Sequence, residues 1–209
     1  MKYEAIMFDL DGTLWDATDN IIKAWDKAIG EFDELKDRQI SEKELQSVFG
    51  MPMDTITDIL FPELSKERQD EVMQRCCEVE NDYLNEHGGV LYPGLLDTLK
   101  KLCETHKLFI VSNGQAGYIE SFLNSQDLWD YFTDIRNWGD NPVSKGENIK
   151  LVMEKNNIKS AVYVGDTIGD ADSAADAGID FIFASYGFGD VKDYTYSIDS
   201  ITGLLDIEL

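Results

Sequence analysis

The first fourteen residues combine a short apolar run with an acidic turn, and they constrain the fold more than any other segment. Ala5–Phe8 are four apolar residues in succession, which is typical of a central strand covered on both faces. The run continues into residues 9–14, DLDGTL. Asp9 and Asp11 lie two positions apart, so both side chains leave the strand on the same side. The glycine after them permits a sharp turn. These residues therefore predict a buried strand that delivers two carboxylates to the end of a sheet, where α/β folds bind ligands.

Three later segments also place polar groups beside apolar runs or at a helix start. An apolar run over 108–111 ends in Ser-Asn-Gly, and a further apolar run over 161–164 ends in Gly-Asp. Between them, Lys145 opens an amphipathic helical pattern. In chain order, the candidate site residues are Asp9, Asp11, Ser112, Asn113, Lys145, Asp166 and Asp170.

The four carboxylates of this set would surround one crevice in which Lys145 is the single obvious cation. Carboxylates packed so closely either shift their pKa values upward or bind a metal ion. Oxygen ligands favour a hard divalent cation such as Mg²⁺. Zinc is excluded by the donor set, because no cysteine or histidine lies near these segments.

The pattern between residues 15 and 91 is helical throughout and contains no strand candidate. From Tyr92 onward helices and strands alternate, which predicts βα units and a parallel sheet. We therefore expect an α/β fold with a Rossmann-like parallel sheet core, residues 1–14 and 92–209, flanked by helices. Residues 15–91 would be an inserted α-helical unit that overhangs the crevice, because the chain leaves and rejoins the core beside the two acids.

Composition limits the partners and the compartment. The net charge of −23, from 18 Lys and Arg against 41 Asp and Glu, would repel a polyphosphate backbone, so we expect no nucleic-acid partner. No apolar run approaches the ~20 residues needed to cross a membrane. The apolar strand starts too close to the N-terminus for a signal peptide, and three cysteines without metal-ligand spacing suit a reducing compartment. We expect a cytoplasmic protein.

The order of the polar groups resembles the four motifs of the haloacid dehalogenase-like hydrolases, and the resemblance covers essentially the whole chain. It identifies residues 15–91 as a helical cap domain. It implies that Asp9 is the nucleophile, forming an aspartyl-phosphate, and that Asp11 is the general acid and base. It further implies two binding sets: a Mg²⁺ site of Asp9, the Asp11 backbone carbonyl, Asp166 and Asp170, and a phosphate site of Ser112, the backbone near Asn113, and Lys145.

Within this family, the resemblance favours Mg²⁺-dependent phosphatases of small phosphorylated metabolites, phosphoglycolate-like or sugar phosphates. The family's dehalogenases and cation pumps lack an acid at the position of Asp11. Gly165-Asp166 with Asp170 is similar to the phosphoglycolate phosphatase group, whereas β-phosphoglucomutases favour Glu-Asp there. A sugar phosphomutase and a non-catalytic binding or regulatory protein on the same fold remain alternatives. The expected partner is a small phosphate ester, for a monomer or weak dimer.

Two loops are candidates for the margins of the site. Gly50-Met51-Pro52 resembles the cap loop of the same phosphatase group, so we expect Gly50, Met51 and Met53 to contribute to substrate specificity. The glycine-rich segment 185–189 follows the last predicted strand and is expected to form a flexible rim of the crevice.

Overall fold

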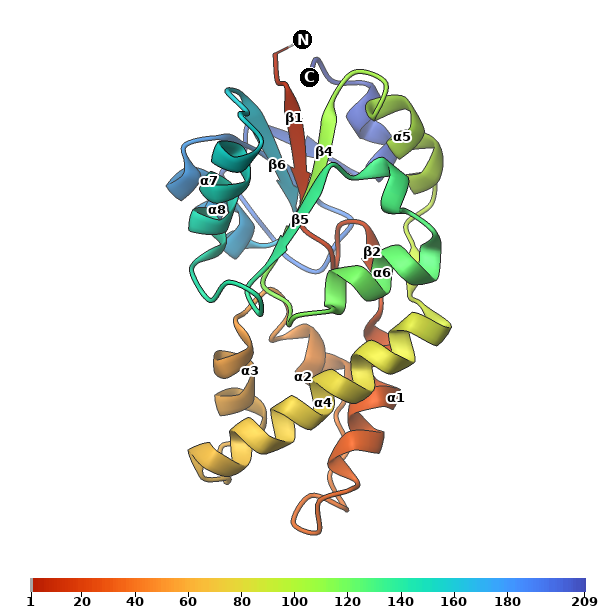
Figure 1. Ribbon diagram of the computed structural model, residues 1–209, viewed down its shortest axis with the longest axis vertical. Helices are drawn as coiled ribbons and strands as arrows, with labels where there is room; N and C mark the ends of the chain where they lie inside the picture. The colour runs from red at the N-terminus through yellow and green to blue at the C-terminus, as the bar shows by residue number, and fades with distance from the viewer. Residues whose placement is uncertain (1) are drawn as a thin grey trace.

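A six-stranded parallel sheet forms the centre of the protein. The structure is a computed structural model that describes residues 2–209, so Met1, which begins the predicted core range, lies outside the described residues (Figure 1). The strands run in the order β5-β4-β1-β6-β7-β8, and every pair in the sheet is parallel. The predicted α/β fold is therefore confirmed. The strands are β1 (Ala5–Phe8), β4 (Lys107–Ser112), β5 (Asp134–Asn137), β6 (Ala161–Gly165), β7 (Asp180–Ala184) and β8 (Tyr196–Ile198).

Helices cover both faces of the sheet, and the alternation of side chains along β1 shows why. Ile6 and Phe8 point into the larger apolar cluster, which α5, α6 and the 3₁₀ helix η2 close. Ala5 and Met7 point into the second cluster, under α7 and α8. All four side chains are fully buried, as the apolar run predicts. These helices are α5 (Leu95–Leu102), α6 (Tyr118–Gln126), α7 (Lys145–Lys155), α8 (Ile168–Ala177) and η2 (Ile201–Leu205); a short 3₁₀ helix, η1 (Trp129–Tyr131), precedes β5.

The segment between β1 and the rest of the sheet forms a helical unit at the carboxyl ends of the strands (Figure 1). The long helix α4 packs along α1 within this unit. Ser41 and Glu44 make the capping box expected from their spacing, and Ser65 caps α4. The helices are α1 (Thr18–Ile29), α2 (Glu42–Gln46), α3 (Met53–Leu60) and α4 (Lys66–His87).

The prediction that residues 15–91 contain no strand was wrong. β2 (Trp15–Asp16) and β3 (Val90–Leu91) form an antiparallel pair in which Trp15 lies opposite Leu91. Two residues per strand are too few to show an alternating pattern, so no local signal marks these strands. The first strand, β1, covers the predicted apolar run Ala5–Phe8. The division into a core and a cap domain stays a prediction.

Across residues 2–209, no helix is both long enough and apolar enough to cross a membrane. The expected cytoplasmic location and the expected monomer or weak dimer stay predictions.

Candidate active site

The polar residues at the carboxyl ends of three neighbouring strands lie together at one edge of the sheet. β1 lies between β4 and β6, and the chain order reverses there, since β4 and β5 extend to one side of β1 and β6 to β8 extend to the other. Loops diverge at such a point and leave a crevice. Asp9 follows β1, Ser112 ends β4 and Asp166 follows β6, and all three side chains are buried.

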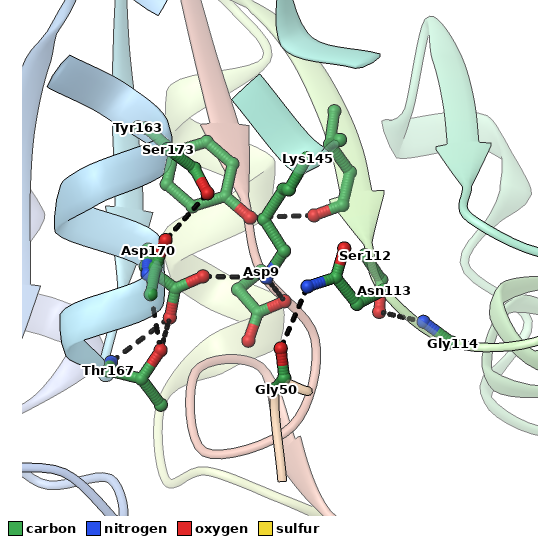
Figure 2. Close-up of polar contacts among 12 residues, drawn as sticks. Asp9, Gly50, Ser112, Asn113, Gly114, Lys145, Tyr163, Thr167, Asp170 and Ser173 are labelled. Atoms are coloured by element: carbon green, nitrogen blue, oxygen red, sulfur yellow. Dashed lines mark hydrogen bonds and ion pairs between the residues drawn. The ribbon is translucent and has the colours of Figure 1, made fainter. Parts of the chain in front are cut away.

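Lys145 joins two of the predicted acids in a buried ion-pair network. Its Nζ lies 2.9 Å from Oδ1 of Asp9 and 2.6 Å from Oδ1 of Asp170 (Figure 2). The lysine is the first residue of α7, whose N-cap is Ser144. Burial opposes the charged lysine, but Asp170 and Asp9 outweigh this effect and hold the pKa of Lys145 well above its ordinary value. The side chain is therefore cationic beside Asp9 at neutral pH.

Asp9, Asp166 and Asp170 form an acid cluster that suits a hard metal ion. One carboxylate oxygen from each lies within 4.8 Å of the others. Burial and the other carboxylates raise the pKa of Asp9 to about 6 and that of Asp166 to about 8. Oδ1 of Asp166 is buried and has no hydrogen-bond partner within residues 2–209. An unpaired buried acceptor among repelling acids is stabilised by a divalent cation, so these residues fit Mg²⁺. The Asp11 carboxylate is not part of this cluster.

Asp170 also fixes the surrounding backbone. Its Oδ2 accepts hydrogen bonds from the backbone N–H of Thr167 at 3.0 Å and from the Thr167 hydroxyl at 2.7 Å. Thr167 is the N-cap of α8, so one acid completes a capping box with one oxygen and binds Lys145 with the other. This carboxylate therefore positions the lysine as well as lying beside the candidate metal site.

Asp11 is held by two aromatic side chains that the sequence analysis did not identify. Its Oδ1 accepts a hydrogen bond from the Tyr118 hydroxyl at 2.7 Å and one from Nε1 of Trp15 at 3.0 Å. Burial raises the pKa of Asp11 to about 8, although the bond from Tyr118 opposes the shift. A carboxyl group that holds its proton near neutral pH can act as a general acid.

The loop after β4 connects the crevice to the helical unit. The Ser112 hydroxyl accepts a hydrogen bond from the backbone N–H of Gly114 at 3.2 Å. The side-chain amide of Asn113 donates to the Gly50 carbonyl at 2.8 Å (Figure 2). The rings of Phe49 and Phe188 lie 5.0 Å apart across the same boundary. The predicted specificity loop is thus in contact with the loops that follow the strands.

The segment 185–189 packs against Asp166 of the acid cluster. The backbone N–H of Phe188 donates to Oδ2 of Asp166 at 2.7 Å. A Cβ atom at Gly187 would collide with the side chain of Asp166, so only glycine permits this approach. The Tyr186 hydroxyl donates to the Thr13 carbonyl at 2.8 Å. The expected flexibility of this rim stays a prediction.

One pocket, with a cavity volume of about 50 Å³, joins the strand ends to the helical unit. Gly50, Met51 and Met53 all line it, together with Asp9 and Asp11. The side of the pocket away from the sheet is lined by Ile21, Trp25, Leu45, Phe49, Ile56 and Glu80.

Glu80 is the one acid on this far side, and the sequence analysis missed it. The side chain lies on the buried stripe of α4, four residues after Cys76 and four before Leu84. An acid at that spacing among buried apolar residues was the available signal. Burial raises the pKa of Glu80 to about 7.

Comparison with known sequences agrees with this arrangement. A sequence model of the haloacid dehalogenase-like hydrolases matches residues 6–184. The chain belongs to this family. Among haloacid dehalogenase-like relatives, a protein named phosphoglycolate phosphatase from Vibrio vulnificus is 29% identical over 224 residues, which cover 100% of this chain and 97% of the relative. A phosphoglycolate phosphatase from Synechococcus elongatus is 27% identical, with 90% and 86% covered.

Solved structures of this family share the fold. A haloacid dehalogenase-like family hydrolase from Streptococcus pneumoniae superposes with a TM-score of 0.84 at 22% identity, covering 98% of both chains. A structure described as a predicted phosphoglycolate phosphatase from Haemophilus somnus gives a TM-score of 0.85 at 19% identity, covering 99% of this chain and 98% of that one. These two likenesses establish the haloacid dehalogenase-like fold for essentially the full length of the chain.

Proposed function

We propose that this haloacid dehalogenase-like hydrolase is a Mg²⁺-dependent phosphatase that hydrolyses a small phosphate monoester through an aspartyl-phosphate. The observation that carries the proposal is the buried contact of Asp9 with Lys145 beside a pocket that Asp11 also lines. The relatives named phosphoglycolate phosphatase support a phosphate monoester as the substrate. A small-molecule substrate also agrees with the net charge of −23, which disfavours polyanionic partners.

In the first step, Asp9 attacks phosphorus and the bond to the leaving oxygen breaks. Asp11 gives its proton to that oxygen, so the alcohol leaves neutral. In the second step, Asp11 removes a proton from water as the water attacks the phosphorus of the acyl phosphate. Inorganic phosphate leaves and the Asp9 carboxylate returns. Lys145 and the Ser112 hydroxyl offset negative charge on the phosphoryl oxygens in both steps.

The metal site belongs to the same proposal. Asp9, Asp166 and the backbone carbonyl of Asp11 would hold Mg²⁺, and Asp170 would hold its waters. Bound there, Mg²⁺ supplies positive charge that offsets the acid cluster and the substrate phosphate. The free oxygen of Asp166 supports this assignment, since it is a buried carboxylate oxygen to which no group of residues 2–209 donates a hydrogen bond.

Phosphate release from a panel of phosphate esters tests the proposal. We expect release with Mg²⁺, partial activity with Mn²⁺ and none after exhaustive chelation. Ca²⁺ should inhibit, because it prefers more ligands at longer distances and would disturb the in-line geometry. Full activity in excess chelator would contradict the metal assignment. Isomer interconversion without phosphate release would identify a phosphomutase, and no turnover of any ester would identify a non-catalytic protein.

A further inference from the structure

Glu80 places a buried carboxylate on the side of the pocket that would receive the leaving group. The residue is 3% exposed and comes from α4. One oxygen, Oε1, accepts a hydrogen bond from the side-chain amide of Gln115 at 3.1 Å, and the other accepts one from the indole N–H of Trp25. A carboxylate accepts about four hydrogen bonds, so both oxygens retain capacity for a ligand.

No cation of the described chain offsets this acid. Within residues 2–209, the pocket lining contains no lysine, arginine or histidine, and Glu80 makes no ion pair. Lys145 is the buried cation nearest the chemistry, and Asp9 and Asp170 already bind it. A buried charge without a counter-charge is costly, so this carboxyl group either holds a proton or gains a cationic partner from a ligand.

The walls around Glu80 are apolar and aromatic. Trp25, Phe49, Met51 and Met53 are among the residues that line the pocket. Aromatic faces attract cations and pack against alkyl groups. A substrate carboxylate bound among these residues would be repelled by Glu80 and would find no cationic side chain to bind.

We propose that the leaving group of the substrate is an amino alcohol, whose protonated amine binds Glu80 and whose carbon skeleton packs against the apolar wall. The inference rests on the proposed phosphatase function and specifies its substrate class. The proposed substrate differs from phosphoglycolate, for which the relatives are named. Phosphoglycolate carries a carboxylate on its leaving group, and Glu80 would repel that charge.

A matched series of substrates tests this inference. We would measure kcat/KM in Mg²⁺ for ω-aminoalkyl, n-alkyl and ω-carboxyalkyl phosphates of equal chain length, with p-nitrophenyl phosphate as a reference. The wild-type protein should prefer the amine over the alkyl ester by about tenfold or more, the scale of one charge pair in a desolvated site. The carboxyalkyl ester should be the poorest of the three.

The Glu80→Gln variant tests the residue itself. The measured quantity is the ratio of kcat/KM for the amine and alkyl esters within one preparation, so loss of correctly folded protein cancels. This ratio should fall toward one in Glu80→Gln. Glu86→Gln is the control, because Glu86 is exposed on the same helix outside the pocket, and it should keep the wild-type ratio.

Three results would overturn the inference. These are a wild-type preference for the carboxyalkyl ester, equal rates for the amine and alkyl esters, and an unchanged ratio in Glu80→Gln. Turnover of p-nitrophenyl phosphate in the same assays would show that the phosphatase proposal survives such a result. If no ester, p-nitrophenyl phosphate included, releases phosphate, both proposals fail.

Discussion

The two ends of the pocket are built in opposite ways. At the sheet end, Asp9, Ser112, Lys145 and Asp166 stand at strand ends or a helix start, and each polar group has a short contact that fixes it. At the far end, apolar side chains from α1, α2 and α3 line the pocket together with one acid of α4, Glu80. In the proposed mechanism, the bond-breaking groups follow the strands of the sheet, whereas the proposed leaving-group contacts come from an insertion. Side chains of an insertion can change without altering the sheet.

The largest expected effect lies at the sheet end. Asp9→Asn should lower kcat by on the order of 10⁴-fold or more, because an amide cannot form the acyl phosphate. Rapid quench with a radioactive ester should show a hydroxylamine-sensitive label in the wild type and none in the variant. Asp19→Asn, an exposed change on α1, is the control. Equal labelling of Asp9→Asn and wild type would remove Asp9 from the nucleophile role.

Asp11 separates the two steps. Asp11→Asn should slow hydrolysis of an alkyl phosphate by about 10³-fold, the usual scale for general acid–base catalysis. Loss of phosphorylation with p-nitrophenyl phosphate should be smaller, because that leaving group needs no proton. Phosphoenzyme should then accumulate, since the attacking water lacks its base. A burst experiment measures this, and equal losses with both esters would contradict the role.

Lys145→Ala should lower kcat by about 10²-fold or more, like removal of one preorganised charge-stabilising donor. The acids it contacts would also lose their counter-charge. Steady-state kinetics measure the change, with Lys150→Ala as the control because Lys150 is a half-exposed lysine on the same helix. A variant within about twofold of wild type would transfer the cationic role to another residue.

The acid at the far end should make stability depend on pH. The pKa of Glu80 is raised from 4.5 to about 7, so the folded protein holds this proton more tightly than the unfolded chain. Stability is then highest below the unfolded pKa and falls as pH rises through 7. The metal-free Glu80→Gln variant has no such titration. At pH 7 its free energy of unfolding should exceed that of the wild type by up to about 3 kcal/mol.

Urea unfolding at a series of pH values in chelator measures this difference. Asp11 and Tyr118 also face Glu80, but they are present in both proteins, so their titration largely cancels in the comparison. Glu86→Gln should follow the wild-type curve. A difference that shrinks as pH rises would contradict the burial of a charged Glu80.

The smallest expected effect concerns the predicted specificity loop. Met51→Ala and Met53→Ala should change the preference between a natural ester and p-nitrophenyl phosphate by roughly tenfold or less, the scale of an apolar pocket contact. Ile59→Ala, an exposed change on α3 outside the pocket, should leave the ratio unchanged. If both substrates lose the same factor, residues 15–91 support the structure and do not select the substrate.

The sequence predicted the sheet end far better than the helical end. The runs before Asp9 and Asp166 are apolar, and parallel strands bring their carboxyl ends to one edge, so local patterns sufficed to place these residues together. The start of the helix at Lys145 was equally clear, because its inner-face residues repeat at helical spacing.

The far end could not be placed in this way, because helical periodicity shows which face is buried and not which helix covers it. Glu80 lies on the buried face of α4, but only the packing of α4 over α6 brings it to Gln115. The same limit applies to Tyr118 and Trp15, whose patterns indicate core positions and whose polar tips reach Asp11. Long-range pairings of this kind have no local signal.

The antiparallel pair of β2 and β3 has a consequence for how such a protein can diversify. Trp15 lies opposite Leu91, and paired strands are ~4.8 Å apart. The two ends of the inserted segment are therefore adjacent in space. The entropy of closing such a loop grows only slowly with its length. A longer, shorter or unrelated insert between β2 and β3 would therefore leave the register of β1 unaltered. Descendants of one hydrolase could thus exchange the whole insert, acquiring new substrates while inheriting the phosphoryl chemistry intact.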